Sequence, residues 1–189
     1  MSCKCKKDNC VCRKVRRIAE VQDEVANNDC CRSGSCEMSI RDLVSPTGNG
    51  NGNDTIPFML LCGCENTFAG LLPYFAWGVR RENDCFGPVP SPFFRVKKFK
   101  EDDDCCAILE LLFPSLCDET PDSICDLFLF DGWFSTGICV EVDLSCFTGI
   151  TCFPPTTTMS ANSAQMAAGL KAVNALRADK NAMLGLANQ

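Results

Sequence analysis

The sequence predicts a mainly β fold: an antiparallel sandwich or barrel of about six to seven short strands, with an N-terminal amphipathic helix and a C-terminal helix. Two observations carry this prediction. Between residues 56 and 153, short apolar runs alternate with proline, glycine and aspartate, which is typical of strands joined by turns. On either side of this region, residues 14–27 and 160–188 place apolar side chains at helical spacing.

Composition shifts along the chain indicate five segments. A flexible cysteine- and lysine-rich arm is followed by a helix with a cysteine loop, then by a loop rich in glycine and asparagine that separates both from the β region. A stiff linker and the last helix close the chain. The segments are the arm (1–13), the N-terminal helix and cysteine loop (14–44), the Gly/Asn loop (45–55), the β domain (56–153), and the linker and C-terminal helix (154–189).

The first helix is expected over residues 14–27, where Val15, Ile18 and Val25 recur near helical spacing and charges fill the other face. Residues 29–37 surround Ser-Gly-Ser and read as a loop.

The β domain holds seven apolar runs, at 56–62, 73–79, 92–99, 105–113, 124–130, 139–144 and 146–153. In the run 139–144, alternation places Val140, Val142 and Leu144 on one face and Glu141 and Asp143 on the other. The run 105–113 fits a strand, but its residues also have helix-forming propensity, so both alternatives stay open.

The C-terminal helix is indicated by the absence of proline after residue 159 and by an amphipathic stripe. Ser160, Asn162 or Ser163 is the expected cap. The stripe consists of Met166, Leu170, Val173 and Leu176 or Arg177.

Composition excludes several classes of function. The net charge of −6 opposes binding to nucleic acid or to anionic membranes, and no apolar stretch is long enough for membrane insertion. The chain has no histidine, which excludes Ser-His-Asp and Cys-His catalysis and mixed Cys/His zinc sites. We therefore expect neither an enzyme nor a cofactor.

Cysteine is the unusual feature, with 17 in 189 residues. A chain of this length can fold without disulfides, so stability alone does not explain this number. Because 17 is odd, at least one cysteine must remain a thiol, bind a metal or bond to another chain. The charged start of the sequence predicts no signal peptide, although disulfide-rich chains are typical of oxidising compartments.

The arm contains Cys3, Cys5, Cys10 and Cys12 among lysines. Repeated Cys-x-Cys spacing resembles that of metallothioneins, so one alternative is a cytosolic thiolate metal-binding protein that holds zinc or copper. The favoured interpretation is that these thiols cross-link chains, because neighbouring lysines lower a thiol pKa and speed disulfide exchange. The acidic run 101–104 lacks the spacing of a calcium loop and reads as a solvated turn.

The position of a cysteine in the sequence indicates which kind of disulfide it could form. Adjacent cysteines in a strand face opposite sides, so one of Cys105 and Cys106 is expected in the core and the other outside. The candidates for bonds between chains are Cys3, Cys5, Cys10, Cys12, Cys30, Cys31 and Cys36. The candidates for bonds within the chain or between its strands are Cys105, Cys106, Cys146 and Cys152.

Three ordered motifs carry a resemblance. They are Ser91-Pro92-Phe93-Phe94-Arg95-Val96; Asp102-Asp103-Asp104-Cys105-Cys106-Ala107-Ile108-Leu109; and Val142-Asp143-Leu144-Ser145-Cys146-Phe147, followed by Gly149-Ile150-Thr151-Cys152. Together they resemble the CotY/CotZ-type cysteine-rich spore coat family, which includes the exosporium basal-layer protein ExsY. The resemblance covers roughly residues 1–153 and does not extend to the last helix.

The resemblance implies a structural subunit of the spore surface (coat, crust or exosporium), made in the mother-cell cytoplasm. Such subunits self-assemble into a two-dimensional lattice that disulfides stabilise, so the expected partners are copies of the chain itself and other coat or exosporium proteins. Mother-cell lysis would remove the reducing cytosol, which accounts for disulfides in a chain without an export signal.

Overall fold

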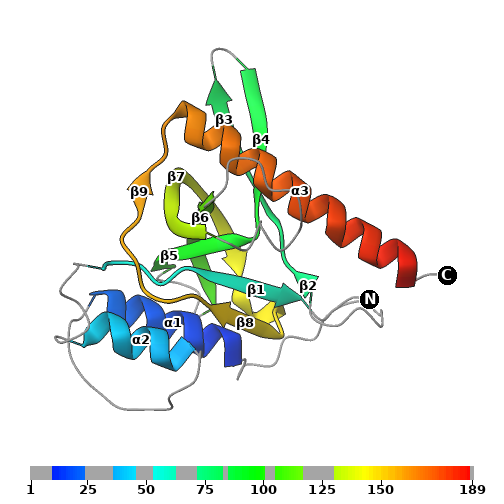
Figure 1. The fold of residues 1–189 in the computed structure, drawn as a ribbon. Helices are drawn as coiled ribbons and strands as arrows, with labels where there is room; N and C mark the ends of the chain where they lie inside the picture. Colours follow the sequence, from blue (N-terminus) through cyan, green and yellow to red (C-terminus); the bar gives the residue numbers. More distant parts are fainter. Residues whose placement is uncertain are drawn as a thin grey trace.

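The computed structural model describes residues 10–23, 36–45, 53–62, 72–82, 85–100, 105–116 and 130–187. Within them the chain is mainly β, with mostly antiparallel strands, an N-terminal helix and a C-terminal helix, as predicted (Figure 1). A second helix on the N-terminal side was not expected. The helices are α1 (Cys10–Asp23), α2 (Cys36–Val44) and α3 (Ser163–Ala187), with a short 3-10 turn, η2 (Leu144–Cys146). The strands are β1 (Phe58–Cys62), β2 (Leu72–Pro73), β3 (Ala76–Glu82), β4 (Cys85–Ser91), β5 (Phe93–Phe99), β6 (Cys106–Leu116), β7 (Phe130–Asp143), β8 (Gly149–Cys152) and β9 (Met159–Ser160).

Seven of these strands form one sheet, and β3 and β4 form a separate two-stranded ribbon. The order along the main path is β2-β1-β5-β6-β7-β9, and β8 pairs with β1 as well. All pairings are antiparallel except that of β7 with β9. The ribbon projects from the body as a hairpin (Figure 1).

The central strand β6 settles the open alternative for residues 105–113, which form a strand and not a helix. Two adjacent residues of β6, Leu111 and Leu112, are both fully buried but belong to different apolar clusters. The same is true of the adjacent residues Phe93 and Phe94 in β5. A strand buried on both faces shows a continuous apolar run without alternation, and a buried helix can show the same. This explains why the sequence pattern left the choice open.

The N-terminal and C-terminal helices both pack on the sheet, and α3 contributes to both apolar clusters. Val15 and Ile18 of α1 belong to the larger cluster, together with Val96 and Leu109 of the sheet. Ala172 and Leu176 of α3 pack on Phe93, Leu112 and Trp133 in the smaller cluster. Helix α2 lies beside α1 at the end of the molecule opposite the hairpin (Figure 1).

The predicted stripe of α3 is confirmed, since Met166, Val173 and Leu176 are buried and Leu170 packs partly against the core. The cap is Asn162: its side chain accepts from the Gln165 N–H, and the Gln165 side chain accepts from the Asn162 N–H, each at 2.9 Å. This reciprocal pair is a capping box, which fixes the start of the helix.

Three local expectations were wrong. Helix α1 begins at Cys10, inside the segment predicted as a flexible arm. Residues 24–27, where the helix was predicted to end, lie outside the described residues. Residues 36–44, predicted partly as loop, form α2. Strand β4 was not predicted, because its two prolines read as turn residues; a two-stranded ribbon tolerates them at its edge. The run 124–130 lies outside the described residues except at Phe130, where β7 begins.

Strand β7 contains a bulge. Between the pairs Leu112↔Ser135 and Glu110↔Cys139, three residues of β7 face the single residue Leu111. Gly137 at the centre of the bulge has φ of 69°, a left-handed conformation that only glycine adopts without strain.

Candidate disulfide and cross-linking sites

Helix α1 holds Cys12 on its buried face. Val11, Val15 and Ile18 recur at helical spacing and are almost fully buried, and Cys12 lies beside them with 6% of its surface exposed. The thiol therefore points toward the sheet because the helix must bury this stripe.

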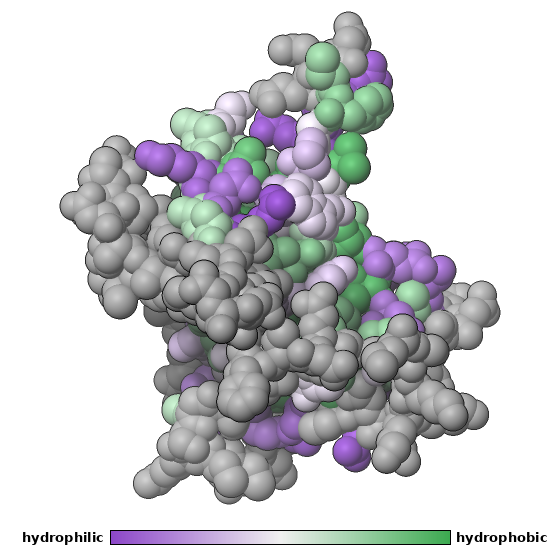
Figure 2. Space-filling model, turned by 90° about the vertical axis from the view of Figure 1, so that its right-hand side faces the viewer, coloured by the Kyte–Doolittle hydropathy of each residue, from purple (hydrophilic) through white to green (hydrophobic). Residues whose placement is uncertain are grey.

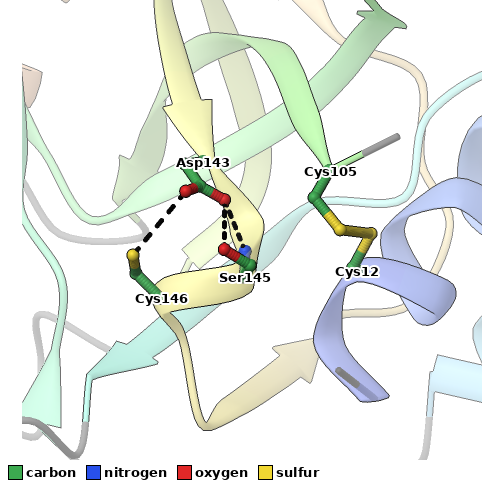
Figure 3. Close-up of a disulfide and its surroundings, with 5 residues drawn as sticks. All are labelled: Cys12, Cys105, Asp143, Ser145 and Cys146. Carbon is green, nitrogen blue, oxygen red and sulfur yellow. Dashed lines mark hydrogen bonds between the residues drawn. A yellow bond between two sulfur atoms is a disulfide. The ribbon is translucent and has the colours of Figure 1, made fainter. Parts of the chain in front are cut away.

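Cys12 forms a disulfide with Cys105, the residue immediately before β6 (Figure 3). The two Cα atoms lie 5.6 Å apart, well within the range for a disulfide. The bond joins α1 to the start of a central strand across a sequence separation of 93 residues.

A second disulfide joins Cys36 at the start of α2 to Cys152 at the end of β8. The Cα atoms lie 4.9 Å apart, and both side chains are buried. Each N-terminal helix is thus held on the sheet by one bond.

These bonds correct part of the predicted assignment. Cys12 and Cys36 were expected to link chains, yet the structure pairs both within the chain. The physical reason is helical periodicity: Cys36, Ile40 and Leu43 lie on one buried face of α2, as Cys12 does on α1. The helical spacing of Cys36, Ile40 and Leu43 could have indicated in the sequence that Cys36 is buried. It was missed because residues 29–37 were predicted to form a loop. Cys105 and Cys152, expected to bond within the chain or between its strands, are the partners of these two cysteines.

Cys105 and Cys106 lie on opposite sides of the chain, as adjacent residues in extended structure do. Cys105 packs against the larger apolar cluster through its bond to Cys12. Cys106 is half-buried and pairs in register with Asp143, and its thiol donates to Glu141 Oε1 at 3.4 Å. The Lys100 ammonium, which donates to the same oxygen at 2.8 Å, lowers the pKa of Glu141, and the Cys106 thiol adds to this effect.

Cys146 belongs to a tight turn after β7 (Figure 3). One oxygen of Asp143 accepts from the Ser145 N–H at 2.9 Å and from the Ser145 hydroxyl at 2.6 Å, and the Cys146 thiol donates to its other oxygen at 3.8 Å. The Leu144 N–H donates to the Cys105 carbonyl at 2.9 Å. Two of the motifs singled out in the sequence therefore meet beside the Cys12–Cys105 disulfide.

Two exposed thiols were missed in the sequence. Cys85 lies at the start of β4, near the tip of the hairpin, and Cys139 lies in β7. Both follow turn or bulge signals, Asn-Asp before Cys85 and Gly137 before Cys139, and such positions favour surface exposure. A third thiol, Cys62 at the end of β1, is half-buried.

The surroundings of Cys139 reduce its reactivity. Partial burial raises the pKa of this thiol, and the nearby Glu110 carboxylate raises it further, whereas Lys97 and Arg95 act in the opposite direction. Because the thiolate is the reactive form, the raised pKa lowers the reactive fraction of Cys139 at neutral pH.

Glu110, the residue opposite Cys139, is the centre of a buried polar network. Arg95 Nε and Nη2 each lie 2.7 Å from its Oε2, and Ser135 Oγ and the Gly137 N–H donate to its Oε1, the latter at 2.9 Å. Burial raises the pKa of Glu110, but the hydrogen bonds from Ser135, Arg95 and Gly137 and the Arg95 charge outweigh it, so the net pKa is lowered. The signal in the sequence was a pair of opposite charges within apolar runs, Arg95 in the run 92–99 and Glu110 in the run 105–113.

Of the remaining candidates for bonds between chains, only Cys10 lies within the described residues. Cys3, Cys5, Cys30 and Cys31 lie outside the described residues, and Cys10 is the first residue of α1. Within the described part of the chain, no three His, Cys, Asp or Glu side chains gather as a metal site would require. No helix in the same ranges is both long and apolar enough to span a bilayer.

Comparison with known proteins identifies the family of this chain. The sequence model of the family described as Spore coat protein Z matches residues 1–155. The chain belongs to this family. One similar relative, Spore coat protein Z of Bacillus subtilis (strain 168), is 30% identical over 159 residues, which cover 79% of this chain and 92% of the relative. No solved structure matches.

Membership in the Spore coat protein Z family accounts for the motifs that the structure brings together. The match ends before α3, so this helix lies beyond the part shared with the family model.

Proposed function

We propose that the chain is a structural subunit of the bacterial spore outer layer that self-assembles into a two-dimensional lattice stabilised by disulfide cross-links, with no catalytic role. Membership in a spore coat protein family supports the location at the spore surface. The expected partners are further copies of the chain and other coat or exosporium proteins.

The observation that carries the cross-linking part is the division of the cysteines by position. Two disulfides, Cys12–Cys105 and Cys36–Cys152, join the two N-terminal helices to the sheet. Cys85 and Cys139 instead expose their thiols at the surface, and neither forms a disulfide with another described residue. The first group stabilises the subunit and the second is available to the layer.

The candidates for bonds between chains are therefore revised. Cys85 and Cys139 join Cys3, Cys5, Cys10, Cys30 and Cys31, and Cys12 and Cys36 leave the set.

The chemistry requires an oxidant, and molecular oxygen suffices once the mother cell has lysed. Two thiols lose two protons and two electrons as one sulfur–sulfur bond forms, and one molecule of oxygen accepts both electrons and both protons to give hydrogen peroxide. Before lysis the reducing cytosol keeps exposed thiols reduced, so subunits first associate through reversible contacts. Many weak contacts per subunit then act together, and later disulfides make the lattice kinetically stable.

The test is assembly of the purified full-length chain with and without reductant. We expect ordered sheets in electron micrographs, which dissociate at low protein concentration while reduced and persist after oxidation by air. A chain that remains a soluble monomer in both states contradicts the proposal.

A further inference from the structure

The hairpin formed by β3 and β4 exposes an apolar face. Four large hydrophobic side chains are exposed among the described residues, and three of them lie on this hairpin: Trp77 (49% exposed), Val79 (64%) and Phe86 (72%). Figure 2 shows apolar side chains on the projection at the top of the molecule. An exposed apolar patch confined to one element indicates a binding surface and not chance exposure.

The strand register places these three side chains on the same face. Val79 pairs with Pro88 and Arg81 with Phe86, and Trp77 lies two residues before Val79. Because directly opposed residues of an antiparallel pair share a face, Trp77, Val79, Phe86, Pro88 and Arg81 form one ladder. We call these five residues the outer hairpin face.

The opposite face of the hairpin is already occupied. Gly78 lies so close to Ile138 of β7 and Leu111 of β6 that a side chain at this position would collide with both. Val89 is buried in the larger cluster. The hairpin is therefore fixed to the body by one face, and the outer hairpin face is presented to solvent.

Two arginines hold the aromatic rings in position. The Arg177 guanidinium of α3 lies 4.6 Å from the centroid of the Trp77 ring, and that of Arg81 lies 5.9 Å from the centroid of Phe86. Side chains that are ordered before binding lose less conformational entropy when a partner arrives.

The distribution of charge favours a second copy of the chain as the partner that binds the outer hairpin face. The chain carries a net charge of −6, so copies repel each other over most of their surface. Residues 76–91 contain Arg80 and Arg81 against Glu82 and Asp84, which gives a formal charge of 2 − 2 = 0. The hairpin is thus a neutral, apolar element through which two copies of an acidic chain can approach.

We propose that the outer hairpin face packs against the same face of a second copy across a two-fold axis. Flat apolar ladders of two ribbons stack as facing sheets do, and self-complementary contacts of this kind are the commonest in homo-oligomers. The inference rests on the proposed function and identifies one of the contacts between subunits.

The size of the face defines the kind of contact. Two aromatic side chains and a valine, all partly covered, offer on the order of a few hundred Å² per copy. Two copies therefore bury less than the ~1,200 Å² of a stable complex. The contact is a weak one that acts within a lattice and does not produce a persistent isolated dimer.

The first experiment compares assembly of the reduced full-length chain with that of the double variant Val79→Thr/Phe86→Ser. Burying a Val or Phe side chain is worth more than the free energy of a tenfold change, so the variant should need at least about tenfold more protein to assemble. Met159→Ser is the matched control, because Met159 is also exposed (54%) but lies on β9. Thermal unfolding confirms that all three proteins are folded.

The outcomes separate the two proposals. If the wild type assembles and the double variant assembles at the same concentration, the hairpin contact is wrong and the proposed function stands. If the wild type does not assemble in either redox state, the proposed function fails. Loss of assembly in Met159→Ser as well would contradict a contact specific to the hairpin.

A second experiment identifies the occupant directly. The variant Phe86→p-benzoylphenylalanine keeps an aromatic side chain and forms a covalent bond on irradiation. In an equal mixture of isotopically light and heavy chains, we expect cross-linked peptides that join light to heavy chains within residues 76–91. Cross-links to other segments, or only within one chain, overturn the proposal.

Discussion

At the scale of single residues, Glu110 shows how a charge can be placed inside the sheet. The side chain is almost fully buried, and Arg95, Ser135 and Gly137 satisfy its two oxygens. Removing one partner of such a group leaves the other charge buried without compensation, which costs far more than losing a surface ion pair.

We therefore predict that Glu110→Gln lowers the free energy of unfolding at neutral pH by about 3 kcal/mol or more. Denaturation by urea measures the change. Glu141→Gln is the control, because Glu141 also accepts from a lysine but is exposed, and its free energy of unfolding should stay nearly unchanged. Equal effects of the two substitutions would contradict the role of the buried network.

The pH dependence of Glu110 follows from the sign of its pKa shift. Its pKa in the folded state lies below the ordinary value of 4.5, so its contribution to stability is present above pH 4.5 and is lost as the pH falls through the folded pKa. The difference in unfolding free energy between wild type and Glu110→Gln should thus be constant near neutral pH and shrink under acidic conditions. A difference that grows on acidification would contradict this.

Residue-level prediction from the sequence succeeded where a period was visible. The alternation of Val140, Val142 and Leu144 against Glu141 and Asp143 is found in β7 and the turn after it: the three apolar residues lie inward and the two acidic residues are exposed. The network around Glu110 was missed because its members come from β5, β6 and β7, and only the sheet register brings them together.

At the scale of elements, the two disulfides determine how firmly α1 and α2 are held. Each closes a loop of about a hundred residues, with sequence separations of 93 and 116. Bonds across loops of this length strongly restrict the unfolded chain.

We expect Cys12→Ser to lower the stability of the oxidised protein by about 2–4 kcal/mol, and Cys36→Ser to do the same. Hydrogen exchange should show the loss first in the helix that the bond holds. Cys85→Ser serves as the control, since Cys85 is exposed and forms no disulfide with another described residue, and the stability of this variant should match that of the wild type. Reductant should abolish the difference caused by the lost bond.

Gly169 in α3 provides a test of packing between helix and sheet. Helix propensity alone would predict that Gly169→Ala stabilises the helix by about 1 kcal/mol. In the structure, a Cβ at this position would lie 2.5 Å from Phe113 Cδ2. Because overpacking a core costs about 1–3 kcal/mol, Gly169→Ala should destabilise the protein in thermal unfolding. A raised melting temperature would show that the helix does not lie this close to β6.

Elements with a strong period were predicted, and those with conflicting local signals were not. The stripe of α3 and most apolar runs became the expected helix and strands. Helix α2 is short and begins beside a Ser-Gly-Ser segment, and β4 contains two prolines, so local composition outweighed the tertiary contacts that define both.

At the scale of the whole molecule, the mainly β class followed from the sequence, but the strand order did not. The register of β8 on β1 and the separate β3–β4 ribbon depend on contacts between distant segments, which no local pattern specifies. The same limit applies to the cysteines. Their number indicated cross-linking, but only the fold distinguishes the cysteines that form disulfides within the subunit from those exposed at its surface.

The most direct test of this division is non-reducing peptide mapping of an air-oxidised assembly made from equal amounts of isotopically light and heavy chains. Peptides joined through Cys12–Cys105 and Cys36–Cys152 should carry a single label, whereas peptides linked through Cys85, Cys139 or the other candidate cysteines should combine light and heavy chains. If every disulfide-linked peptide carries a single label, the disulfides do not connect subunits and the layer is not held together by cross-links.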